Sequence, residues 1–136
     1  MSILADYRVL ADRNISLPST GSIQDFSIVL PNNFFQATEH LPLLSFRLDT
    51  GIPSNLMFRI LTANAIFTAF VIAFTATYNS DVVHSVHEVI NIERLRGGVN
   101  NTIRFERFGG TGTLDISDIV LFYKRNVNAS NLSNTP

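Results

Sequence analysis

The sequence contains no cysteine and no tryptophan among its 136 residues. The absence of cysteine excludes disulfide bonds, thiolate metal sites and cysteine nucleophiles. Charge is also scarce, because charged residues make up 15% of the chain, against about 25% in typical soluble domains. The formal net charge is −1, so no net field attracts nucleic acid or an anionic membrane surface. We therefore expect no nucleic-acid partner.

Apolar runs long enough for a membrane helix are missing too. The longest run, AIFTAFVIAFTA, covers about a dozen residues, short of the roughly 18 to 20 that a span requires. The N-terminus MSILADYRVLADRN carries early charges and lacks the apolar core of a classical signal peptide. We expect a soluble protein without a membrane span, cytoplasmic or exported by a non-classical route, whose compartment stays open.

The chain does have ample material for one hydrophobic core, with 46% apolar residues and eleven phenylalanines. Its length favours a single domain, which we place at residues 1–125, followed by a polar, Asn- and Ser-rich tail at 126–136. Lys124 is the sole lysine beside nine arginines. Lysine is depleted and arginine enriched at protein interfaces, so this bias predicts a homo-oligomer.

Short alternating segments separated by turn residues indicate an all-β fold. The alternation places three sets of apolar side chains on inward faces: Phe26, Ile28 and Leu30; Leu44, Phe46 and Leu48; Leu56, Phe58 and Ile60. We interpret TGIPSN, RGGVNN and GGTG as turns between strands. The inward parity shifts between Ile116 and Ile119, which predicts a β-bulge around Ser117 and Asp118.

The segment IFTAFVIAFTATY, residues 66–78, is apolar on both of its alternating faces. Its β-branched and aromatic content favours a strand that is covered on both sides. A two-layer sandwich buries only one face of a strand, so the second face predicts an oligomer interface. That interface comprises Phe67, Ala69, Val71 and Ala73. A covering loop is the alternative.

Two groups of side chains could hold a metal: His84, His87 and Glu88, and Glu106, Asp115 and Asp118. A zinc site lacks an evident third ligand, and positions 84 and 87 point to opposite faces of the strand that the β-branched residues favour. An aspartate at a bulge commonly bonds its own backbone, which favours a structural role. We expect no cofactor, with calcium at Glu106, Asp115 and Asp118 as the open alternative.

Four arginines, Arg94, Arg96, Arg104 and Arg107, are interleaved with Phe105 and Phe108. Such a patch could bind phosphate, a carboxylate-bearing sugar or a single-stranded nucleic acid. Glutamates lie among the arginines, however, so cross-strand ion pairs explain the pattern without a ligand. The residue order provides neither a nucleophile elbow nor a catalytic triad, and we expect no enzyme.

The stretches LRGGVNNTIRF and GTLDISDIVLFY, within Leu95 to Tyr123, resemble the closing hairpin of galactose-binding-like jelly rolls, the fold of many carbohydrate-binding modules. The resemblance implies one antiparallel jelly-roll β-sandwich of about eight strands, with ligand-binding loops at one end. Calcium is a common structural ion in that family. The chain departs from the pattern because such modules commonly stack sugar on tryptophan or tyrosine, and it has no tryptophan.

These observations predict a non-catalytic, lectin-like module that binds carbohydrate as a homo-oligomer, in which multivalency strengthens weak individual sites. The predicted ligand-binding residues are Tyr78, His84, Arg94, Arg96, Asn100 and Asn101. The alternative is a structural, self-assembling subunit of a shell, fibre or filament whose only partner is itself. The two-faced apolar segment favours that alternative.

Overall fold

The computed structural model describes residues 2–35, 37, 39–91 and 94–127. The strands of this part are β1 (Ser2–Ala11), β2 (Ile15–Ser16), β3 (Ile23–Val29), β4 (Phe34–Phe35), β5 (Leu43–Asn64), β6 (Val71–Tyr78), β7 (Val82–Val89) and β8 (Asn100–Val127). All their pairings are antiparallel. Within the described residues, no helix has the length and apolarity to cross a membrane.

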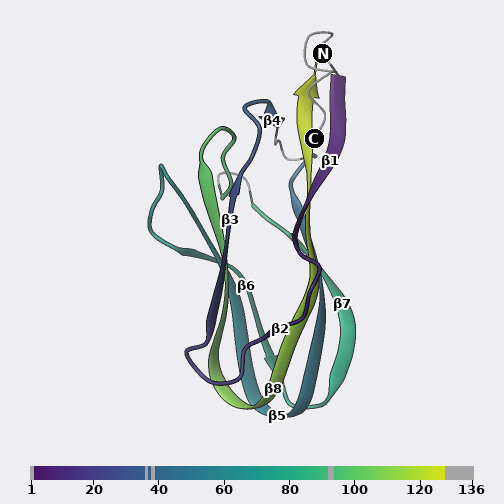
Figure 1. Cartoon of the computed structure of the whole chain (residues 1–136), viewed down its shortest axis with the longest axis vertical. Helices are drawn as coiled ribbons and strands as arrows, with labels where there is room; N and C mark the ends of the chain where they lie inside the picture. The colour runs from purple at the N-terminus through teal and green to yellow at the C-terminus, as the bar shows by residue number, and fades with distance from the viewer. Residues whose placement is uncertain (1, 36, 38, 92–93, 128–136) are drawn as a thin grey trace.

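Two long strands, β5 and β8, pass through both layers of the fold. They pair with each other from Leu43 opposite Phe122 to Asn64 opposite Asn101. The first half of β5 and the second half of β8 form one layer with β7 and β1, and the remaining halves form the other layer with β6 and β3. Figure 1 shows β5 and β8 turning from one layer to the other at the lower end. The chain is an antiparallel, jelly-roll-like β-sandwich, as predicted.

The stretches TGIPSN and GGTG are not chain reversals, and this part of the strand prediction was wrong. Each lies inside a continuous strand and forms a corner, where the β5–β8 register shifts. The corners pack closely: a Cβ on Gly110, whose φ is 76°, would lie 2.0 Å from the carbonyl oxygen of Asn55. Glycine is needed there because any side chain would collide with the facing backbone.

The segment 66–78 is not one strand either, because β6 begins at Val71 and residues 65–70 form a loop. The side chain of Asn64 ends the preceding strand: its Oδ1 accepts hydrogen bonds from the backbone N–H groups of Ile66 at 2.9 Å and Phe67 at 2.8 Å. This local bonding turns the chain before the apolar residues can join the sheet. Loop 65–70 therefore leaves Ile66 and Phe67 about half exposed, at 56% and 51%.

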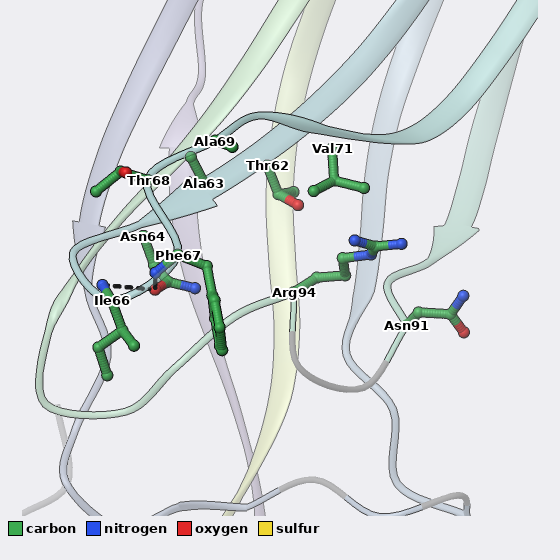
Figure 2. A pocket seen from close by; sticks show the side chains of 10 residues that line it. All are labelled: Thr62, Ala63, Asn64, Ile66, Phe67, Thr68, Ala69, Val71, Asn91 and Arg94. Carbon is green, nitrogen blue, oxygen red and sulfur yellow. Dashed lines mark hydrogen bonds between the residues drawn. The ribbon is translucent and has the colours of Figure 1, made fainter.

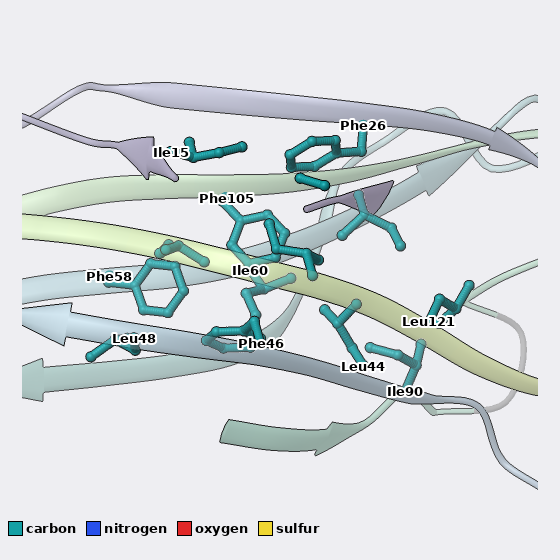
Figure 3. Close-up of a cluster of buried hydrophobic side chains, with 14 of the residues drawn as sticks. Ile15, Phe26, Leu44, Phe46, Leu48, Phe58, Ile60, Ile90, Phe105 and Leu121 are labelled. Atoms are coloured by element: carbon teal, nitrogen blue, oxygen red, sulfur yellow. The ribbon is translucent and has the colours of Figure 1, made fainter. Parts of the chain in front are cut away.

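The core lies between the layers, and its predicted inward positions are confirmed. Phe46, Phe58 and Phe105 are at most 1% exposed, and their ring centroids lie 5.5–6.0 Å apart (Figure 3). The predicted bulge is also present: Ser45 pairs with Val120, the next pair is Arg47 with Ser117, and Asp118 has a φ of 53°.

The predicted tail begins inside the last strand. β8 continues to Val127, and its final residues Asn126 and Val127 pair with Ile3 and Ser2 of β1. Residues 128–136 lie outside the described part. The strand predicted to contain His84 and His87 is present as β7, which ends at Val89.

Candidate functional site

The predicted ligand-binding residues lie at two separate ends of β6. Tyr78 pairs with Leu56 at the corner end, whereas Val71 pairs with Thr62 at the opposite end, and about 23 Å of strand separates them. His84 lies beside Tyr78, with ring centroids 6.1 Å apart. Burial raises the pKa of the Tyr78 phenol. The two rings therefore do not share a site with the arginines.

A cavity of about 740 Å³ lies at the Val71 end. Its walls come from the end of β5, loop 65–70, the start of β6 and the segment after β7, as Figure 2 shows. The lining residues are Thr62, Ala63, Asn64, Ile66, Phe67, Thr68, Ala69, Val71, Asn91 and Arg94. Arg94 is the one predicted ligand-binding residue among them.

Phe67 gives the cavity an aromatic wall that is held in place. The Arg96 guanidinium carbon lies 4.8 Å from the centre of the Phe67 ring, a cation–π contact. A second contact of this kind anchors the end of the loop, where Arg104 lies 3.9 Å from the centre of the Phe70 ring. Together with the Asn64 hydrogen bonds, these contacts position an exposed aromatic ring on a loop.

Polar groups on the opposite side of the cavity have unused bonding capacity. Thr62 is 1% exposed, and its Oγ1 has no hydrogen-bond partner among the described residues. Figure 2 shows its hydroxyl on the side of the cavity where Arg94 lies. The described lining includes no Asp or Glu, so Arg94 contributes the only formal charge within it. A buried hydroxyl without a partner is rare in proteins, which points to water or a ligand at this position.

Asn101 was predicted to bind ligand, but the structure gives its side chain a different role. It is 0% exposed. Its Oδ1 accepts from the Arg96 backbone at 2.8 Å, and its Nδ2 donates to the carbonyls of Arg96 at 2.9 Å and Val99 at 3.0 Å. These bonds leave no surface for an outside molecule. Asn101 instead fixes the backbone of Arg96, which in turn supports Phe67.

Asn100 is exposed and is not part of the lining of the large cavity. It lines a smaller cavity of about 220 Å³ with Phe70 and Thr102, and its carbonyl accepts a hydrogen bond from the Ala65 backbone at 3.0 Å. Its main-chain group therefore holds the same loop that carries Phe67.

The residues predicted as an oligomer interface do not form a flat strand face. Phe67 and Ala69 lie in loop 65–70, and both line the large cavity together with Val71. Ala73 instead packs against the core. A register shift between Ile60 and Leu61 on the neighbouring strand accompanies this change of parity in β6.

The arginine patch is largely structural. Arg104 forms a two-pronged ion pair with Asp25 across β8 and β3, at 2.8 Å and 3.0 Å. The hydrogen bond to Asp25 raises the pKa of Arg104 above its usual value against a lowering effect of burial, and the negative charges of Asp25 and Glu106 add to the rise. Arg107 is 2% exposed and turned into the fold. Within the described residues, one arginine of the patch, Arg104, thus forms a cross-strand ion pair, and its partner is Asp25 and not a glutamate of the patch.

The three acidic residues considered for calcium differ in their contacts. Glu106 is bonded to Arg59, and Asp115 accepts a hydrogen bond from the Asn14 amide at 3.3 Å. Asp118 occupies the bulge of β8. In the described ranges, no three His, Asp or Glu side chains gather into a group that could hold a metal ion.

Comparisons with known proteins support the fold. No family model matches the sequence, and no curated protein matches it. The xylan-binding module CBM15 aligns with a TM-score of 0.58 and 9% identity, over 90% of this chain and 95% of that chain. A variant of CBM29-2, a family 29 carbohydrate-binding module, aligns with a TM-score of 0.52 and 16% identity, over 89% and 93%.

The same fold also occurs inside larger proteins. Dimeric latent PorU from Porphyromonas gingivalis aligns with a TM-score of 0.57 and 8% identity, over 93% of this chain but 13% of that chain. A further match is a segment of a xylanase chain. At these identities the similarities show the fold alone. This chain has the β-sandwich fold of carbohydrate-binding modules over most of its length.

Proposed function

We propose that the protein is a non-catalytic carbohydrate-binding module whose site is the cavity between Phe67 and Arg94. The observation that carries the proposal is the exposed Phe67 ring, held by Arg96 beside polar groups that have unused bonding capacity. The fold similarity to carbohydrate-binding modules supports it.

The chemistry of the cavity suits a saccharide. A pyranose ring has an apolar C–H face that packs on an aromatic ring, and hydroxyl groups at its edge that need hydrogen-bond partners. Phe67 offers the ring, while Thr62, Asn91 and Arg94 line the same cavity with polar groups. The volume of about 740 Å³ lies within the range of small-molecule sites, roughly 300 to 1,000 Å³. Phenylalanine thus takes the role that tryptophan or tyrosine has in the modules that the sequence resembles.

The test is saccharide binding by glycan array, followed by calorimetric titration of the strongest hit. Phe67→Ala should weaken that binding tenfold or more, a loss of about 1.4 kcal/mol or greater. Ile52→Ala is the matched control, because Ile52 is 87% exposed and lies at the distant corner of β5. Equal affinity of the two variants would contradict a site at Phe67.

We further propose that the module is a homo-oligomer built through the outer face of the β1–β8–β5–β7 layer, with a second copy as the occupant. A row of side chains crosses this face, because Tyr7 pairs with Phe122, Phe122 with Leu43 and Leu43 with Val89. Tyr7, Phe122 and Val89 are 58%, 44% and 50% exposed. Contiguous exposed apolar groups of this kind mark interaction surfaces.

The charges beside this row fit a copy of the same surface. Arg47 and Asp49 follow on the outward side of β5, and neither has an ion-pair partner among the described residues. A twofold axis places the same patch on both subunits, so Arg47 of each copy can approach Asp49 of the other. The face is therefore complementary to itself in both apolar surface and charge.

Light scattering tests the assembly. The measured mass should be twice that of the 15.1 kDa chain. Phe122→Arg should give a folded monomer, whereas Ile52→Arg at the exposed corner should not change the mass. A wild-type monomer would overturn this part of the proposal.

The same apolar face also favours a second function, a structural subunit of a shell, fibre or filament. Mass that grows with concentration, without any saccharide binding, would support that function.

A further inference from the structure

Arg94 differs from the other arginines near the cavity in having no partner for its side chain within the described residues. Ion pairs engage Arg59 with Glu106 and Arg104 with Asp25. Arg96 rests on the Phe67 ring. Arg94, in contrast, forms a hydrogen bond through its backbone N–H, which donates to the Asn91 carbonyl at 3.2 Å. Its guanidinium group is left to interact with whatever occupies the cavity.

The surroundings of Arg94 indicate the charge of the occupant. The cavity is lined by apolar and neutral polar residues, and the described lining has no carboxylate to neutralise the guanidinium group. A cation in a partly enclosed site of lower dielectric attracts an anion more strongly than a cation in open water does. The cavity therefore favours a ligand with one negative charge over a neutral ligand.

The second polar observation is independent of the first. Thr62 Oγ1 is buried, lines the same cavity and lacks a hydrogen-bond partner among the described residues. A hydroxyl group can donate to an anionic oxygen, and hydrogen bonds to ionised groups are about twice as strong as neutral ones. Arg94 and Thr62 thus provide two kinds of donor at one end of the cavity, with the Phe67 ring as an apolar wall.

We propose that the saccharide bound here is acidic and carries the carboxylate of a uronic acid residue, an inference that rests on the proposed function. The guanidinium group of Arg94 binds the carboxylate through its planar fork, and the Thr62 hydroxyl donates to the same anion. The sugar ring packs on Phe67. A carboxylate offers the fork two coplanar oxygens. Its single charge matches the single cation, whereas a phosphate monoester carries a charge of about −1.5 to −2 at neutral pH.

The experiment compares one oligosaccharide in two forms, a uronic-acid oligomer and the same oligomer after reduction of its carboxyl groups to alcohols. Calorimetric titration should give at least tenfold tighter binding of the acidic form at low salt, with the preference falling as salt is added. Arg94→Gln should remove the preference, so that the variant binds the acidic and the reduced oligomer with equal affinity. Arg94→Lys should restore only part of it, because lysine keeps the charge and loses the fork.

Two further variants locate the effect. Thr62→Val preserves the shape of the side chain and should weaken binding of the acidic form several-fold. Arg13→Gln is the control, since it removes one positive charge from an exposed position outside the cavity. If Arg13→Gln lost the preference to the same extent as Arg94→Gln, the net charge of the protein would explain the effect. That result would overturn the inference. Thermal melts of all variants verify that each one is folded.

The remaining outcomes separate this inference from the proposed function. Equal binding of the acidic and reduced oligomers would overturn the acidic ligand and leave the carbohydrate-binding module intact. Equal binding of a sulfated oligomer of the same length would overturn the choice of a carboxylate. If no saccharide of either form binds the wild-type protein, both the function and the inference fail.

Discussion

The guanidinium group of Arg107 donates a hydrogen bond to the carbonyl oxygen of Gly112 at 2.7 Å, across the corner of its own strand. It also donates to the carbonyls of Leu17 at 3.0 Å and Gly110 at 3.2 Å. The two glycine carbonyls lie where β8 bends between the two layers and its register with β5 shifts, and Leu17 lies just after the end of β2. Arg107 therefore supplies the donors that the corner lacks, which explains a nearly buried arginine in a core position.

Replacement of Arg107 tests this account of the corner. Arg107→Met keeps much of the side-chain volume and removes all three donors, so it should lower the free energy of unfolding by about 2–4 kcal/mol. Arg104→Met is the control, because the Arg104–Asp25 pair is partly exposed, at 28% and 40%, and such pairs contribute about 0–1 kcal/mol. Urea unfolding followed by circular dichroism measures both. Equal losses would show that Arg107 has no special role.

A glycine pair tests the close approach of β5 and β8 at the corners. Gly110→Ala introduces a Cβ 2.0 Å from the Asn55 carbonyl oxygen at a φ of 76°, and should cost at least about 3 kcal/mol. Gly21→Ala has a similar φ of 93° with nothing within 4 Å, so only the left-handed backbone cost of about 1–2 kcal/mol applies. The difference between the two melting temperatures isolates the steric term.

The sequence predicted the parts of the fold that depend on local alternation. Phe46 and Phe58 follow a period of two within their segments, and a change of that period at Asp118 revealed the bulge. The continuity of β5 and β8 could not be predicted in this way. Glycine and proline mark a departure from straight strand geometry, and the same residues suit a reversal or a corner. Which one forms depends on pairing between residues that are distant in sequence.

The site was harder to predict than the fold. Arg94 and Arg96 stood out because arginine is chemically conspicuous, and both lie at or beside the cavity. Phe67 was interpreted as part of a strand because the segment 66–78 is apolar on both alternating faces. The residue that turns the chain, Asn64, lies just before that segment. Thr62 gave no signal at all. Its unused hydroxyl is a property of its three-dimensional surroundings, and a threonine in a strand is ordinary.

Replacing a core phenylalanine and a cavity phenylalanine by alanine should have different effects on stability. Phe105 is 0% exposed and contacts the rings of Phe46 and Phe58, so Phe105→Ala should cost about 3–5 kcal/mol. Phe67 is 51% exposed, and Phe67→Ala should cost less than about 1 kcal/mol, chiefly the cation–π contact with Arg96. Chemical denaturation of both variants provides the measurement. A large loss in Phe67→Ala would mean that its ring is structural, and its binding data would then need a folded-state control.

Alkaline pH should destabilise the protein through a buried phenol. Tyr123 is 2% exposed, and burial raises the pKa of its hydroxyl above the ordinary value of 10.0. The folded state therefore keeps the phenolic proton more tightly than the unfolded state does. Since the unfolded state loses that proton first, the stability is complete below about pH 10 and is lost as the pH rises toward the folded-state pKa.

The measurement is the urea midpoint as a function of pH between pH 8 and about pH 11, the range that brackets phenol ionisation. Wild type should lose stability above about pH 10, and Tyr123→Phe should reduce that loss, because the buried group no longer titrates. Part of the slope should persist through Tyr78, whose pKa burial also raises. Tyr7→Phe replaces a phenol that is 58% exposed and serves as the control. If Tyr123→Phe and wild type lose stability with the same slope, the Tyr123 phenol does not couple folding to pH.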